Sequence, residues 1–176
     1  STVFPTGQEI NLVEEEAQIT PFPDNLICCG AYSYDLMWRA GYNKHKLAIG
    51  PSLRQDHVFK NKSKKARGRN TVLVALNFAE HLSMELLKVV NHYASTNKSM
   101  EIFVKAHPNL NLDKILPKNL SPNIKIVNKN IGSLLSMAKH FVYVGPTTTA
   151  CEALVSGNIV HRFVSNNFFS MDMLYY

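Results

Sequence analysis

Beyond residue 70 the sequence alternates between short apolar runs and longer amphipathic segments. The runs are rich in β-branched and aromatic residues, which is typical of strands covered on both faces of a parallel sheet. The longer segments repeat apolar residues every three or four positions, and this spacing predicts helices. We expect strands at 71–76, 101–105, 125–127, 141–144 and 159–164, and helices at 80–94, 131–139 and 149–156.

The first third of the chain shows the same alternation on a smaller scale. An apolar run at 25–29 stops at Gly30, and residues 33–40 follow it with near-helical spacing. A second apolar run at 47–49 stops at Gly50. Strand, helix and strand in this order predict a parallel crossover unit. Over the whole chain, the pattern predicts an α/β fold with a parallel, doubly wound, Rossmann-like sheet.

The net charge of +6 on this chain of 176 residues is concentrated in one segment. Without the basic residues of 60–70 (KNKSKKARGRN), the 19 Lys and Arg residues are reduced to the number of Asp and Glu residues, which is 13. A run with so few apolar residues cannot bury a face, so it predicts a solvated linker. We place this basic linker at 57–70, between a front segment at 1–56 and a back segment at 71–176.

The basic segment has two other possible roles. Contact of residues 60–69 with an anionic membrane surface, or with an anionic substrate, stays open as an alternative to the linker. The segment contains no aromatic residue that could stack on bases, so no specific nucleic-acid partner is predicted.

Composition and motifs exclude several classes of protein. Hydrophobic residues make up 45% of the chain, which is globular composition, and no apolar run reaches the roughly 20 residues of a membrane helix. The start, Ser1-Thr2, carries no secretion leader, and adjacent Cys28 and Cys29 do not form a disulfide framework, so we expect a cytoplasmic protein. Metal-ligand clusters, Walker loops, dinucleotide fingerprints and nucleophile elbows are missing from the sequence, so neither a metal nor a cofactor is predicted.

Polar residues follow three of the predicted strands, at the edge where parallel sheets bind ligands. Lys105, His107 and Pro108 stand at the end of one strand, and Asn128 and Lys129 after the next. The strand at 141–144 is followed by a glycine turn and three hydroxyl residues at a helix start, which are Gly145, Thr147, Thr148 and Thr149.

The segment 145–149 has the chemistry of an anion site. A helix start offers unpaired N–H groups, and threonine hydroxyls add further donors for a phosphate. Glu152, one turn into this helix, could accept hydrogen bonds from ribose hydroxyls. The alternatives are that a threonine only caps the helix and that Glu152 only interacts favourably with the helix dipole.

The order of these motifs resembles the carboxyl-terminal nucleotide-sugar domain of GT-B glycosyltransferases. KAHP follows one strand, GPTTTACEAL follows a later one, and SGN precedes the last. The pattern is most similar to enzymes of bacterial surface polysaccharide synthesis that carry a His-Pro motif and a Ser/Thr motif. These enzymes include bacterial polysialyltransferases, Kdo transferases and CDP-glycerol glycerophosphotransferases. The front segment, with Gly30, Gly41-Tyr42, Gly50 and Arg54, is similar to the end of the amino-terminal lobe.

The resemblance covers about residues 24–165 and implies roles for single residues. His107 and Pro108 match the His-Pro motif that contacts the nucleotide phosphate, and Thr147 to Thr149 match the Ser/Thr motif that forms the other phosphate contact. Glu152 takes the position that faces the ribose, and Asn128 and Lys129 lie where the base is held. Residues 71–176 would then be the nucleotide-sugar-binding domain, and residues 1–56 the end of the amino-terminal GT-B lobe.

The resemblance also implies a reaction. It is the metal-independent transfer of a sugar from a CMP- or CDP-linked donor to a glycan or lipid-linked acceptor, in the cytoplasm or at the inner membrane face. No catalytic base is assigned, since that residue usually lies in the amino-terminal lobe and the run Glu14-Glu15-Glu16 is typical of a solvated loop. A GT-B nucleotide-sugar epimerase, a noncatalytic polyanion-binding module and a structural domain with an empty site stay open as alternatives.

The segment 166–176 (NNFFSMDMLYY) is apolar and aromatic. This composition predicts either a terminal helix that packs across two lobes or a segment that packs at the edge of the sheet. If the segment were exposed to solvent, it would favour self-association.

Overall fold

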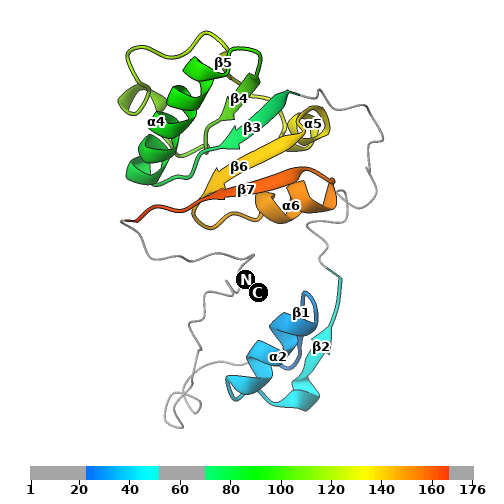
Figure 1. Ribbon diagram of the computed structural model, residues 1–176. Coiled ribbons are helices and arrows are strands. Elements are labelled where there is room, and N and C mark those ends of the chain that lie inside the picture. Colours follow the sequence, from blue (N-terminus) through cyan, green and yellow to red (C-terminus); the bar gives the residue numbers. More distant parts are fainter. Residues whose placement is uncertain (1–22, 52–69, 167–176) are drawn as a thin grey trace. The chain divides into compact units, whose positions relative to one another are not determined.

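The computed structural model describes residues 23–51 and 70–166 (Figure 1). The chain divides into two compact units, Ser1–His57 and Val58–Tyr176, which are described one at a time below. Nearly all of the basic linker expected at 57–70 lies outside the described residues, as do the Glu14-Glu15-Glu16 run and residues 167–176.

The first unit contains the expected parallel crossover. Strand β1 (Leu26–Cys28) pairs in parallel with β2 (Leu47–Ile49), and helix α2 (Ala31–Arg39) and a short 3-10 turn (Lys44–Lys46) connect them. A small core of Cys28, Met37 and Leu47 holds the three elements together. Helix α2 begins two residues earlier than expected because Gly30, at φ 129°, turns its carbonyl to accept the N–H of Tyr34 at 3.1 Å.

The second unit contains every strand and helix expected of the back segment. The strands are β3 (Thr71–Ala75), β4 (Glu101–Lys105), β5 (Ile124–Ile126), β6 (His140–Val144) and β7 (Ile159–Phe163). The helices are α4 (Glu80–Thr96), α5 (Ile131–Met137) and α6 (Thr149–Val155), with a 3-10 turn at Leu112–Lys114.

All five strands of the second unit form one parallel sheet in the order β5-β4-β3-β6-β7. The chain starts in the middle at β3, moves outward to β5, and crosses back to β6 and β7. Because right-handed crossovers in opposite directions place their helices on opposite faces, this order predicts a doubly wound sheet. Figure 1 shows α4 on one face and α5 and α6 on the other.

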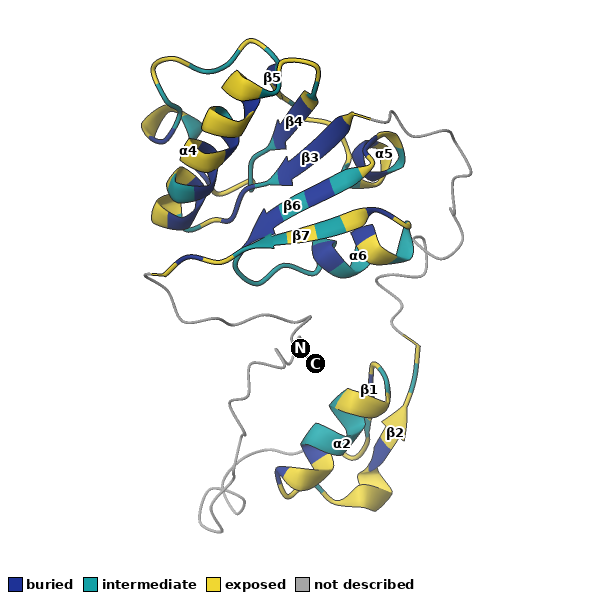
Figure 2. Ribbon diagram, in the orientation of Figure 1, coloured by how far each residue is buried: buried dark blue, intermediate teal, exposed yellow. Residues whose placement is uncertain are grey.

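Two hydrophobic clusters confirm this layering. On one face, Val72 and Val74 of β3 pack with Leu82, Leu86 and the rest of the buried side of α4. On the other face, Leu73 packs with the buried residues of α5 and α6. Alternating residues of one strand therefore enter different cores, and Figure 2 shows β3 buried along most of its length. The α/β, Rossmann-like fold expected from the sequence is confirmed.

Helix α5 is shorter than the segment expected at 131–139, because Ala138 already has the extended angles φ −84° and ψ 142°.

Among the described helices, none is both long enough and apolar enough to cross a membrane.

Candidate functional site

The strand order creates a switch point between β3 and β6. The chain leaves β3 through α4 on one face and leaves β6 through α6 on the other, so the loops after these strands diverge. In open parallel sheets this divergence opens a crevice at the carboxyl ends of the strands, where ligands bind. The loop with His107 follows β4 and the loop with Gly145 follows β6, and both strands are neighbours of β3. All three predicted polar clusters therefore lie at one edge of the parallel sheet, and two of them flank the end of β3.

The loop after β3 carries a residue that sequence reasoning missed. Asn77 is buried, and its Oδ1 accepts the N–H of Ala79 at 2.9 Å while its carbonyl accepts the hydroxyl of Ser83 at 2.7 Å. Its Nδ2 donates to the carbonyl of Val144 at 3.4 Å. Asn77 therefore forms the turn that leads into α4 and also links the end of β3 to the end of β6. An Asn between a buried strand and a helix start was the available signal, because Asn side chains commonly bond to the backbone two residues on.

Gly145 fits closely against this asparagine. Its φ of 69° lies in the left-handed region, and a Cβ at this position would lie 2.8 Å from Asn77 Nδ2 and 3.4 Å from Leu82 Cδ1. Both the backbone angle and the space therefore require glycine. The predicted importance of Gly145 has a structural basis in this turn, which sets the direction of the threonine loop.

The threonine loop combines a helix cap with unpaired donors. Thr147 Oγ1 accepts the N–H of Thr149 at 3.2 Å, so this hydroxyl caps α6, as the alternative interpretation expected. Thr148, the N-cap residue, makes no capping bond with its side chain. Among the described residues, none accepts a hydrogen bond from the N–H groups of Thr147 and Thr148. Two backbone donors and the Thr148 hydroxyl therefore remain for a ligand.

His107 is oriented by its own loop. Its Nδ1 accepts the N–H of Asn109 at 3.2 Å, and its carbonyl accepts the N–H of Leu110 at 3.0 Å. Because Nδ1 acts as the acceptor, the neutral ring carries its proton on Nε2, which is then a hydrogen-bond donor. Pro108 is exposed beside it.

Phe78 is a second residue that sequence reasoning missed. Its ring meets that of His107 edge to face, with centroids 5.9 Å apart and an interplanar angle of 65°. The side chain is 61% exposed although it follows a buried strand. This contact joins the loop after β3 to the loop after β4. No sequence pattern indicates it, because the two residues are far apart along the chain.

The other predicted residues lie at various distances from these loops. Lys105 ends β4 and is half-buried, and Glu152 is half-buried in the first turn of α6. Asn128 and Lys129 are exposed after β5, the edge strand. With a strand spacing of about 4.8 Å, the end of β5 is about 14 Å from the end of β6. The structure therefore places the predicted base-binding residues well away from the threonine loop.

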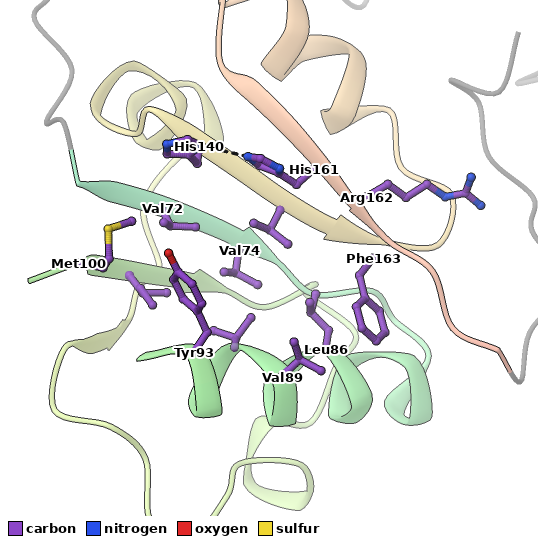
Figure 3. A pocket seen from close by; sticks show the side chains of 13 residues that line it. Val72, Val74, Leu86, Val89, Tyr93, Met100, His140, His161, Arg162 and Phe163 are labelled. Atoms are coloured by element: carbon purple, nitrogen blue, oxygen red, sulfur yellow. Dashed lines mark hydrogen bonds between the residues drawn. The ribbon is translucent and has the colours of Figure 1, made fainter. Parts of the chain in front are cut away.

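The loops at this edge suit an anion. The segments 77–79, 106–110 and 145–149 contain no Asp or Glu. The described residues include no group of three or more His, Cys, Asp or Glu side chains that could hold a metal ion. A groove of about 390 Å³ lies elsewhere, on the α4 face of the sheet, and none of the predicted site residues line it (Figure 3).

A scan of the sequence against models of protein families finds no match, and a search of the curated proteins finds none either.

Proposed function

We propose that the second unit binds a nucleotide-activated sugar and is the donor-binding lobe of a metal-independent GT-B glycosyltransferase. The observation that carries this proposal is the placement of the His107 loop and the threonine loop on either side of β3, at the switch point of the sheet. Neither loop contains a carboxylate, and each offers hydrogen-bond donors. This is the arrangement in which a doubly wound sheet holds phosphate groups.

The spacing of the strands gives the minimum length of a ligand that contacts both loops. The ends of β4 and β6 are two strand spacings apart, about 10 Å, with Asn77 and Phe78 between them. A ligand that touches both loops must therefore lie over the end of β3. A single inorganic phosphate is too small for this, whereas the phosphate and sugar of a nucleotide sugar are long enough to span it.

The hydrogen-bond donors of the two loops would also assist the transfer of the sugar. When the bond between sugar and nucleotide breaks, negative charge develops on the departing phosphate. The N–H groups of Thr147 and Thr148, the Thr148 hydroxyl and His107 Nε2–H would stabilise that charge from two sides without a metal ion. In this proposal Glu152 accepts hydrogen bonds from the ribose, and Asn128 and Lys129 hold the base.

We further propose that the donor is CMP- or CDP-linked and that the acceptor is a bacterial surface glycan or its lipid-linked precursor, in the cytoplasm or at the inner membrane face. The catalytic base would come from a part of the enzyme other than the second unit. This part of the proposal rests on the resemblance in motif order, since the described edge of the sheet has donors for a phosphate but no carboxylate in its loops.

A nucleotide titration tests the proposal. The whole chain is titrated with CMP, CDP, UMP, UDP and GDP by calorimetry and by thermal shift. We expect one pyrimidine nucleotide to bind and to raise the melting temperature through binding linkage. His107→Ala and Thr148→Val should abolish the shift. His92→Ala, which removes an exposed histidine of α4, is the matched control and should retain it.

Three outcomes would contradict the proposal. They are no binding of any nucleotide, equal binding by the His107→Ala variant, and binding of any polyanion without nucleotide preference. The last result, with affinity that falls steeply as salt rises, would favour the polyanion-binding module through residues 60–69. A GT-B epimerase would use the same phosphate contacts and is distinguished by its product, an epimerised nucleotide sugar formed without an acceptor.

A further inference from the structure

The α4 face of the sheet is covered over β3, β4 and the end of β6, where Val144 is buried with α4, and is left open over the rest of β6 and over β7. Figure 3 shows the resulting groove, with α4 along one side and the two strands along the other. Its volume is about 390 Å³, and most of its lining is apolar. The lining side chains come from β3, β4, α4, β6 and β7 of the second unit, with Met100 just before β4.

The groove leaves large apolar side chains in contact with water. Val89 and Tyr93, one turn apart on α4, line it and are 51% and 47% exposed. Val142 of β6 and Phe163 of β7 line it as well, and both are only partly buried. On the opposite face the same two strands are covered, since Phe141 and Val160 pack in the cluster with α6. On the groove side these strands also carry His140 and His161, whose rings are hydrogen-bonded to each other at 2.9 Å. The apolar part of this face, at Val142 and Phe163, is the part expected to be covered.

We propose that residues 167–176 of this chain occupy the groove. Phe163, the last residue of β7, lines it, and the described part of the chain ends three residues later at Asn166. Three residues of chain span at most about 10 Å, so the segment starts beside the groove. Phe168, Phe169, Met171, Met173, Leu174, Tyr175 and Tyr176 are apolar or aromatic, which leaves only three polar residues in the segment.

The length of the segment also fits. Ten residues in a helix span about 15 Å, and the five residues of β6 or of β7 span about 16 Å. A helix of this length would cover the open face from one end of the two strands to the other.

The occupant completes the layering of the sheet. With residues 167–176 in place, β6 and β7 would have helices on both faces, as β3 has from α4 and from α5 and α6. The segment would bury the exposed sides of Val89 and Tyr93, and removal of apolar surface from water is the driving force. This inference concerns a different face of the sheet from the proposed nucleotide site and does not depend on it.

Photo-crosslinking from inside the groove tests this placement. The crosslinking residue p-benzoylphenylalanine replaces Tyr93, and in a matched control it replaces Met84, which lies on the opposite side of α4 and is also exposed. After irradiation of the whole chain, mass spectrometry locates the linked peptides. We expect position 93 to link to residues 167–176 within one chain, in a yield several times that from position 84.

Other occupants would give different products and would overturn the proposal. Links from position 93 to a second copy of the chain would show an interface between copies. Links to residues 1–57 would show that the first unit covers the groove. Equal, unselective yields from positions 93 and 84 would show that the groove stays open.

A hydrogen-exchange experiment avoids the bulky crosslinker. In the full chain, Phe168→Ser combined with Phe169→Ser removes the first two aromatic residues that follow β7 in the sequence. We expect the amides of β7 and of the second half of α4 to exchange several times faster than in the unmodified chain. Asn167→Ser is the matched control and should leave exchange unchanged. Unchanged exchange in the double variant would overturn the placement.

Discussion

Gly145→Ala should destabilise the second unit because two independent terms oppose a side chain at this position. The φ of 69° costs a residue with a Cβ about 1–2 kcal/mol. The new Cβ would also stand 2.8 Å from Asn77 Nδ2, so Asn77 must move and lose its bond to the carbonyl of Val144. A lost hydrogen bond of this kind costs about 1 kcal/mol. The sum is about 2–3 kcal/mol in the free energy of unfolding.

Urea unfolding followed by far-UV circular dichroism measures this loss, since the second unit contains most of the regular structure. Gly132→Ala in α5 is the matched control. Gly132 is helical, without a positive φ, and its nearest neighbour is Asn130 Oδ1 at 3.3 Å, so the change should alter stability by less than about 1 kcal/mol. In an Asn77→Ala background, Gly145→Ala should cost only the backbone term, about 1–2 kcal/mol. A loss for Gly145→Ala no larger than that for Gly132→Ala would refute this reasoning.

Three further predictions concern other parts of the chain. Asn158 Nδ2 donates to the carbonyls of Leu135 at 2.9 Å and Ala138 at 2.7 Å. Asn158→Ala should therefore lower the free energy of unfolding in urea by about 2–3 kcal/mol, and a decrease of less than about 1 kcal/mol would contradict this. Burial, then His161 and then Lys139, hold the pKa of His140 below its ordinary value of 6.5. Stability from this group is therefore present above pH 6.5 and is lost as the pH falls through the lowered pKa. Melting temperatures between about pH 8 and pH 5 should fall less in His140→Asn than in the unmodified chain, whereas equal slopes would exclude this role. Burial, followed by the neighbouring Cys29, raises the pKa of the Cys28 thiol. Iodoacetamide should therefore alkylate exposed Cys29 faster than buried Cys28, and equal alkylation rates measured by mass spectrometry would contradict the structure.

Apolar runs located the strands of this chain well, whereas the helix boundaries depended on local contacts and backbone angles. Helix α4 continues to Thr96, past the expected end at Ala94, because Ser95 Oγ and Thr96 Oγ1 donate back to the carbonyls of His92 and Tyr93 at 2.7 and 3.0 Å. The polar residues Ser95 and Thr96 therefore belong to the last turn of the helix. Such side-chain bonds depend on the local conformation, which composition alone does not reveal.

The sequence was sufficient to predict that single residues lie at strand ends, but not which residues surround them in space. His107 and Thr147 to Thr149 follow predicted strands, so the rule for parallel sheets was enough to select them. The order of the strands decides which of these residues are neighbours along that edge, and it placed Asn128 and Lys129 after the outermost strand. Asn77 and Phe78 were missed because their roles come from contacts with Val144 and His107, which lie on other strands and loops.

Nuclear magnetic resonance would locate a bound nucleotide at the level of single residues. The ¹⁵N-labelled chain is titrated with CMP and CDP, and amide shifts are followed residue by residue. If the nucleotide lies across the end of β3, the largest shifts should fall on Thr147, Thr148 and Phe78. Smaller shifts should fall on the His107 loop and on Asn128 and Lys129, which hold the base in this proposal. Shifts confined to the groove beside α4 or to residues 57–70, or no shifts at saturating nucleotide, would contradict a nucleotide site at the switch point of the sheet.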